Sequence, residues 1–210
     1  MGAFSRAAAA AGLCAAMLAA GCASTPPRAA GSAAQSIPDS HYSYSDADVD
    51  FMSGMIPHHA QAVVMAGWCG SHGARKDLAV LCERMVVAQR DEIALMQQWL
   101  RDRGLPVPEA TSTRHRHRMP DGAVHDMLMP GMLTDEEMAA LDRARGAEFD
   151  RLFLSGMIKH HQGAIDMVEV LFKSYGAAQD ETVFKFANDV QVDQAIEIDV
   201  MKDMLEEIKS

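Results

Sequence analysis

Two short stretches of this sequence place a pair of adjacent histidines one helical turn after a methionine. They read "SGMIPHHAQAVVMAG" (residues 53–67) and "SGMIKHHQGAIDMV" (residues 155–168). Imidazole nitrogens bind transition metals, and a methionine thioether selects soft ions such as Cu(I). The candidate metal ligands are therefore two Met-x-x-His-His sets: Met55, His58 and His59, and Met157, His160 and His161.

The two stretches belong to a longer internal repeat. Phe51 recurs as Phe153 and Met65 recurs as Met167, at a constant offset of 102 positions. A second match, "QRDEIALMQQWL" (89–100) against "QAIEIDVMKDML" (194–205), follows at an offset of 105. Self-similarity of this kind indicates two copies of one supersecondary unit.

Each copy has the periodicity of two helices. We predict helices at about residues 46–69 and 76–101 in the first copy, and at about 134–175 and 180–208 in the second, with a possible break near Gly146. The turns inside each copy are short, and one long connection, residues 104–133, separates the copies. This pattern predicts an all-α, ferritin-like four-helix bundle over residues 46–208, built from repeats 46–103 and 134–208, with almost no β-structure.

The helical faces show which side chains point inward. At 100° per residue, Met55 and His58 fall on the apolar stripe of the first helix, with His59 at its edge, and the third helix repeats this arrangement. On the second and fourth helices, a glutamine and a glutamate interrupt an otherwise apolar stripe: Gln89 and Glu92, and Gln194 and Glu197. We expect these four to be additional ligands or hydrogen-bond partners of the ligands, with Gln89 level with Met55 and Gln194 level with His160.

Two interpretations of this cluster remain open. Buried His–Glu and His–Gln hydrogen bonds would hold a bundle in register without any ligand. A buried carboxylate without a partner is costly, however, and the same cluster occurs twice, which favours a metal site. Histidine combined with methionine favours copper, most readily Cu(I), although another transition metal would also suit the imidazoles.

The connection between the repeats is also rich in soft metal ligands. Its segment "RHRHRMPDGAVHDMLMPGM" (114–132) contains seven of them: His115, His117, Met119, His125, Met127, Met129 and Met132. The segment is either a mobile polar loop or an auxiliary region that captures metal.

The N-terminus has the features of an export signal. An apolar stretch follows Arg6, and "LAAGC" resembles a bacterial lipobox that ends at Cys22. We predict a signal peptide over residues 1–22, lipid attachment at Cys22, and a flexible tether over residues 23–45. The protein would then be anchored at the periplasmic face of the outer membrane or at the cell surface. The alternative is an ordinary signal peptide that is cleaved nearby.

Two cysteines remain once Cys14 and Cys22 are assigned to the signal. Cys69 and Cys82 both lie on core stripes of the first hairpin, close to its turn, in what would be an oxidising compartment. A disulfide between them is geometrically reasonable. Two buried free thiols, or two soft metal ligands, are the alternatives.

Composition and missing motifs exclude several classes of function. The net charge of −10 argues against nucleic acid as a partner. After the N-terminus, no apolar run reaches the roughly 18 residues of a membrane-spanning helix, so membrane contact would come through the lipid alone. Neither a phosphate-binding loop nor a nucleophile–base pair appears. The core faces also lack the Glu-x-x-His motif of di-iron oxidases.

The longest informative stretch is "MPGMLTDEEMAALDRARGAEFDRLFLSGMIKHHQGAIDMVEVL". It closely resembles the bacterial family called domain of unknown function 305, and the resemblance extends over about residues 46–208. The resemblance implies a ferritin-like fold, export from the cytoplasm and, in some members, copper binding and copper tolerance. It places the family motif on the two Met-x-x-His-His sets and says nothing about Cys69 and Cys82.

These observations predict an extracytoplasmic lipoprotein that binds and buffers copper. The alternatives are a metal-dependent oxidase or peroxidase, and a metal-free structural or interaction module with buried His–Glu pairs. Protein partners and oligomeric state are left open.

Overall fold

The computed structural model describes residues 44–118 and 124–209. The predicted lipidation site Cys22, the tether up to residue 43 and the candidate ligand Met119 lie outside the described residues.

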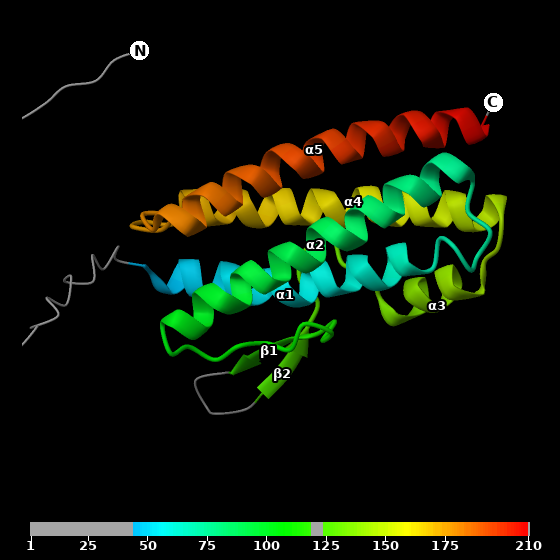
Figure 1. Ribbon diagram of the computed structural model, residues 1–210. Coiled ribbons are helices and arrows are strands. Elements are labelled where there is room, and N and C mark those ends of the chain that lie inside the picture. Colours follow the sequence, from blue (N-terminus) through cyan, green and yellow to red (C-terminus); the bar gives the residue numbers. More distant parts are fainter. Residues whose placement is uncertain (1–43, 119–123, 210) are drawn as a thin grey trace, which may run out of the picture. The chain divides into compact units, whose positions relative to one another are not determined.

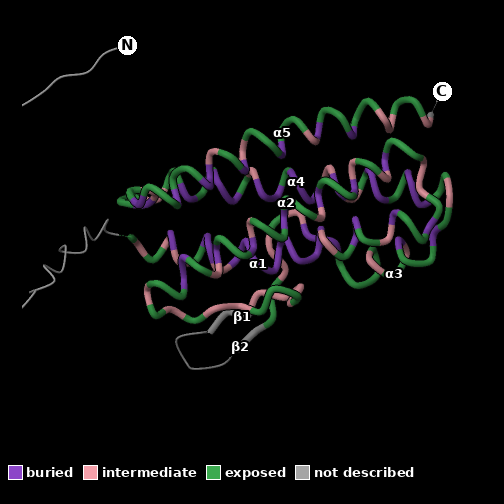
Figure 2. Tube along the Cα trace, viewed as in Figure 1, coloured by how far each residue is buried: buried purple, intermediate pink, exposed green. Residues whose placement is uncertain are grey.

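The fold is all-α and consists of two helical hairpins. Their helices are α1 (Asp46–Gly67) and α2 (Lys76–Asp102) in the first, and α4 (Ala147–Lys173) and α5 (Glu181–Lys209) in the second. Within each hairpin the two helices pack along one another, and α1 also packs against α4 (Figure 1). The buried residues of α2 alternate with exposed ones, whereas α1 is buried almost continuously from Phe51 to Ala62 (Figure 2).

The predicted third helix is divided in two. A short helix, α3 (Asp135–Arg143), precedes α4, and Gly146 adopts a left-handed φ of 57° at the start of α4. α3 begins at a capping box, in which Thr134 accepts a hydrogen bond from Glu137 N–H. Ser45 and Asp48 form the same motif at the start of α1. These caps explain why both helices begin where the sequence predicted.

The connection contains a small β-hairpin that the sequence analysis did not predict. Strands β1 (His115–Arg118) and β2 (Val124–Met127) pair antiparallel, with His115 opposite Met127 and His117 opposite His125. Extended segments outside a helix satisfy their backbone hydrogen-bonding groups by pairing with each other. The expectation of almost no β-structure is confirmed, since the described residues contain only these two strands of four residues each.

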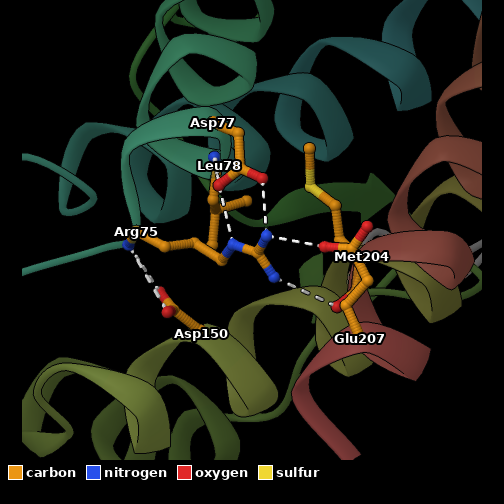
Figure 3. A network of polar contacts seen from close by, with 6 residues as sticks. All are labelled: Arg75, Asp77, Leu78, Asp150, Met204 and Glu207. Atoms are coloured by element: carbon orange, nitrogen blue, oxygen red, sulfur yellow. Dashed lines mark hydrogen bonds and ion pairs between the residues drawn. The ribbon is translucent and has the colours of Figure 1, made fainter. Parts of the chain in front are cut away.

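Polar contacts of Arg75 tie the two hairpins together at one end (Figure 3). Its backbone N–H donates to Asp150 of α4, and its guanidinium pairs with Asp77 at 2.7 Å and with Glu207 of α5 at 2.6 Å. The start of α2 is thereby joined to both helices of the second hairpin.

Cys69 and Cys82 are joined by a disulfide, with their Cα atoms 6.4 Å apart. The bridge connects the end of α1 to the first turns of α2, so it fixes the register of the first hairpin. No helix in the described part of the chain combines the length and apolar character needed to cross a membrane.

Candidate metal centre

All four motif histidines are completely buried in the middle of α1 and α4. The first histidines of the two repeats, His58 and His160, stack with ring centroids 3.8 Å apart and planes inclined by 39°. The second histidines lie to the side, with each ring centroid 6.2 Å from that of its sequence neighbour. His59, which was predicted at the edge of the core stripe, is as fully buried as His58.

The second histidine of each repeat meets the glutamate of the next helix. His59 Nε2 lies 2.8 Å from Glu92 Oε2, and His161 Nε2 lies 2.6 Å from Glu197 Oε2. The His161 contact has hydrogen-bond geometry, whereas the His59 contact is within ion-pair distance but is not aligned as a hydrogen bond. The glutamate side chains are 24% and 26% exposed, so they sit at the rim of the bundle rather than in its core.

The first histidine of each repeat binds a backbone carbonyl instead. His58 Nε2 lies 3.0 Å from the oxygen of Pro130, and His160 Nε2 lies 3.1 Å from the oxygen of His58. A carbonyl oxygen only accepts hydrogen bonds, so Nε2 must carry the proton in both rings. In the neutral ring, the free lone pair is then on Nδ1.

The Nδ1 atoms of all four motif histidines are buried without a hydrogen-bond partner. Burial lowers the pKa of His58 to about 3, and electrostatic repulsion between neighbouring imidazoles acts in the same direction. Burial, followed by the same repulsion with His58, likewise holds the pKa of His160 well below its usual value. Both stacked rings are therefore neutral at pH 7, and neutral imidazole is the form that binds metal.

The two motif methionines are completely buried as well. Met55 packs in an apolar cluster with Met96 and Met167, and Met157 packs in a second cluster with Met65 and Met85. By helical spacing, each thioether lies one turn from a histidine of its own repeat. Soft sulfur donors are thus available in a dry part of the bundle.

The connection docks onto the histidines through residues that the sequence analysis did not single out. Gln61 holds Leu133 at both backbone groups: its Nε2 donates to the carbonyl at 2.9 Å, and its Oε1 accepts from the N–H at 2.8 Å. At Gly163 the backbone of Pro130 approaches so closely that a Cβ would lie 2.0 Å from the Pro130 oxygen. This approach places the Pro130 carbonyl against His58.

A signal for this docking was present in the repeat. Gln61 and Gly163 occupy equivalent positions, since they are 102 residues apart, but they differ in type. The difference marks where the single connection contacts two otherwise similar helices.

The glutamines lie elsewhere than predicted. α1 and α2 run antiparallel, with Cys69 opposite Cys82 and His59 opposite Glu92. Gln89 precedes Glu92 in α2, so it lies beyond His59 along α1 and well past the level of Met55. The His161–Glu197 contact similarly places Gln194 beyond His160. Both glutamines are buried, and their Oε1 atoms have no hydrogen-bond donor, so neither oxygen binds a histidine. The levels expected from the sequence were wrong because the turn lengths alone did not define the register.

The candidate ligands of the connection are spread out. Met129 extends over α1, where its methyl carbon would lie 2.7 Å from a Cβ at Gly54, one turn before His58. His115 and Met127 are cross-strand neighbours in the β-hairpin, as are His117 and His125. Within residues 44–118 and 124–209, no three His, Cys, Asp or Glu side chains converge as in a closed metal site. A metal in the bundle would therefore rely on few imidazoles, supplemented by thioethers.

Comparison with known proteins places the chain in a family. The model of the domain of unknown function DUF305 matches residues 48–205. One similar structure is that of a DUF305 protein from Streptomyces coelicolor, for which secretion is inferred. Its sequence is 26% identical, the TM-score is 0.65, and the match covers 78% of this chain and 94% of that one. A DUF305 fragment from Deinococcus radiodurans is 27% identical, with a TM-score of 0.63 over 78% and 98%.

The structure is also similar to that of CopM, which has been solved in Cu(I)-bound, Cu(II)-bound, silver-bound and apo forms. The Cu(I)-bound form is 26% identical, with a TM-score of 0.58 over 76% of this chain and 96% of CopM. No curated protein matches the sequence. Because the family model covers three quarters of the sequence and solved DUF305 proteins share its helical fold, this chain belongs to the DUF305 family.

Proposed function

We propose that this protein binds copper outside the cytoplasm and buffers it or hands it on. The observation that carries the proposal is the set of four buried histidine Nδ1 atoms without hydrogen-bond partners. In each ring the other nitrogen faces a carbonyl or a carboxylate, which is how proteins orient histidines that bind metal.

The donor set favours Cu(I) over harder ions. The few imidazoles within reach of any one ion would be supplemented by the thioethers of Met55 and Met157, both of which are buried. Thioethers select soft ions, and a singly charged ion is easier to bury than a doubly charged one. Gln89, Glu92, Gln194 and Glu197 would act around the ligands rather than as soft donors.

The comparison with CopM supports the same ion class, since CopM binds copper and silver. Export is supported by the N-terminal signal and by the inferred secretion of the Streptomyces coelicolor relative. Lipid attachment at Cys22 is part of the proposal. Metabolic labelling with a palmitate analogue should modify the wild-type chain but not Cys22→Ser.

The central experiment replaces all four motif histidines. In the chain from residue 23 onward, glutamine at positions 58, 59, 160 and 161 should weaken Cu(I) binding by about 100-fold or more while leaving the helical content intact, because an amide is a poor ligand for a soft ion. An anaerobic titration against a chromogenic Cu(I) chelator measures this. His72→Gln is the matched control, because His72 is buried and contacts Asp142 outside the cluster. Unchanged affinity in the quadruple variant would rule out this site.

A second experiment distinguishes copper binding by the helical bundle from copper binding by the connection. Deleting residues 114–127 removes the β-hairpin but keeps Met129 and Pro130, which contact α1. We expect total copper to fall while the tightest site remains, because ligands on rigid helices need no further ordering. Loss of the tightest site would assign the main function to the hairpin.

A further inference from the structure

A cavity of about 190 Å³ lies between α2 and α5, beside the histidine cluster. Gln89 and Glu92 line it from α2, and Asp193, Gln194 and Glu197 line it from α5. The remaining lining residues are apolar, and none of the described residues around it is a lysine or an arginine.

The cavity has a concentrated negative charge. Asp189, Asp193 and Glu197 follow one another at four-residue spacing on α5, and Glu92 faces them from α2. Like charges at this spacing destabilise a helix. Burial raises the pKa of Asp193, and the carboxylates of Glu92, Asp189 and Glu197 raise it further. Lys185 lines the adjoining groove, but none of the ion pairs formed by the described residues includes Asp189 or Asp193.

Two glutamines that line the cavity have buried amide oxygens without hydrogen-bond donors. Gln89 and Gln194 are each 4% exposed, and the Oε1 atom of each has no hydrogen-bond partner. Leaving a buried polar atom unpaired costs about 1–3 kcal/mol, so two such atoms at equivalent positions of the repeat call for a ligand. A cation in the cavity would reduce the carboxylate repulsion, and it would give the amide oxygens a partner once their side chains turn toward it.

We propose that this cavity is a second cation site, which takes a divalent ion of the oxygen-preferring class such as Mn²⁺, Mg²⁺ or Ca²⁺. Carboxylate and amide oxygens are the ligands that these ions use. No three acidic or histidine side chains among the described residues converge closely enough for full direct coordination, so the ion keeps part of its water shell, for which the cavity has room.

The second site is separate from the proposed copper site. Glu92 and Glu197 stand between them, because one oxygen of each carboxylate contacts a histidine Nε2 while the side chain also lines the cavity. The copper donors are the histidine Nδ1 atoms, whereas the cavity offers oxygens only. Binding of the oxygen-preferring ion therefore does not require that the proposed copper function is correct.

Titration with Mn²⁺, followed by electron paramagnetic resonance of the free ion, tests the proposal on the chain from residue 23 onward. We expect saturable binding of one Mn²⁺ per chain that Ca²⁺ or Mg²⁺ competes away. Asp193→Asn and Gln194→Leu should each weaken binding by about tenfold, since each removes one of only a few oxygen contacts. Asp199→Asn is the control: Asp199 is also on α5 but 81% exposed, paired with Lys202, and outside the cavity.

Two further measurements distinguish a cation site from a purely structural role of the cavity residues and from binding at the histidines. Gln194→Leu should not lower the unfolding midpoint of the metal-free protein, because leucine is similar in size to glutamine and removes the buried oxygen that lacks a donor. The quadruple histidine variant should keep Mn²⁺ binding. The proposal is overturned if wild-type protein shows no saturable Mn²⁺ binding, if Asp193→Asn and Gln194→Leu bind like wild type, or if the histidine variant loses the ion.

Discussion

His58 and His160 stack on each other in the bundle, yet their Nε2 atoms bind carbonyls from different segments. His58 reaches Pro130 in the connection, and His160 reaches the backbone of His58 itself. The connection, α1 and α4 are thereby linked in one chain of contacts. Any displacement of Pro130 should therefore alter the orientation of the stacked rings.

The stability of the metal-free protein should depend on the ionisation of His58. Its folded pKa of about 3 is below the ordinary value of 6.5, so at lower pH the unfolded chain takes up a proton that the folded chain does not. The contribution is absent above about pH 6.5 and grows as the pH falls toward 3. At pH 4.5, His58 should lower the free energy of unfolding by about 2–3 kcal/mol relative to pH 7.

Urea unfolding in the presence of a chelator, at pH 7 and at pH 4.5, measures this effect. His58→Gln cannot titrate but keeps an N–H donor for Pro130, so it should lose less stability than wild type between the two pH values. Equal losses in wild type and variant would show that His58 is protonated in the folded state.

Gly163→Ala should destabilise the protein and weaken copper binding together. The added Cβ would lie 2.0 Å from the oxygen of Pro130, so the backbone of the connection must move, and that same oxygen binds His58. We expect a loss of about 1–3 kcal/mol by thermal unfolding, as for overpacking elsewhere. Gly67→Ala is the matched control, because Gly67 also lies in a helix and has nothing within 4 Å of a Cβ. A Gly163→Ala protein as stable as the control would contradict the close approach.

Gln61→Leu should detach the connection from α1. The substitution removes both hydrogen bonds to Leu133 and leaves its buried N–H and carbonyl unpaired, at a cost of about 2–4 kcal/mol. Hydrogen exchange should show increased exposure of the Leu133 amide. Gln162→Leu serves as the control, since Gln162 is exposed and bonds only to Asp166. Unchanged protection at Leu133 would mean that other contacts hold the connection.

The Cys69–Cys82 bridge should stabilise the first hairpin. Closing a loop of this size contributes about 3 kcal/mol in the chain-entropy model, so the Cys69→Ala/Cys82→Ala variant should unfold at a lower temperature. Intact mass after alkylation without reductant checks the bond itself. Two alkylated thiols would argue against a bridge, and their loss only on addition of Cu(I) would indicate metal ligation.

The sequence by itself determined the helices, the repeat and the inward residues. Met55 and His58 are buried as predicted from the apolar stripe. However, α1 is buried on nearly all sides between Phe51 and Ala62, because the connection packs against it as well as α2 and α4. The capping boxes at Ser45 and Thr134 are local interactions, so the starts of α1 and α3 could be read from a few neighbouring residues.

Only the tertiary structure decided how the repeated histidines differ. The two repeats share one connection, so Pro130 can contact His58 but not its counterpart, and His160 bonds to α1 instead. The sequence shows that Gln61 and Gly163 break the repeat, but their partners Leu133 and Pro130 lie far away along the chain. The register that brings Glu92 to His59 and leaves Gln89 facing a cavity likewise depends on contacts across helices. Periodicity defines the face of each helix, whereas the level of one helix against another is set by long-range packing that no local pattern encodes.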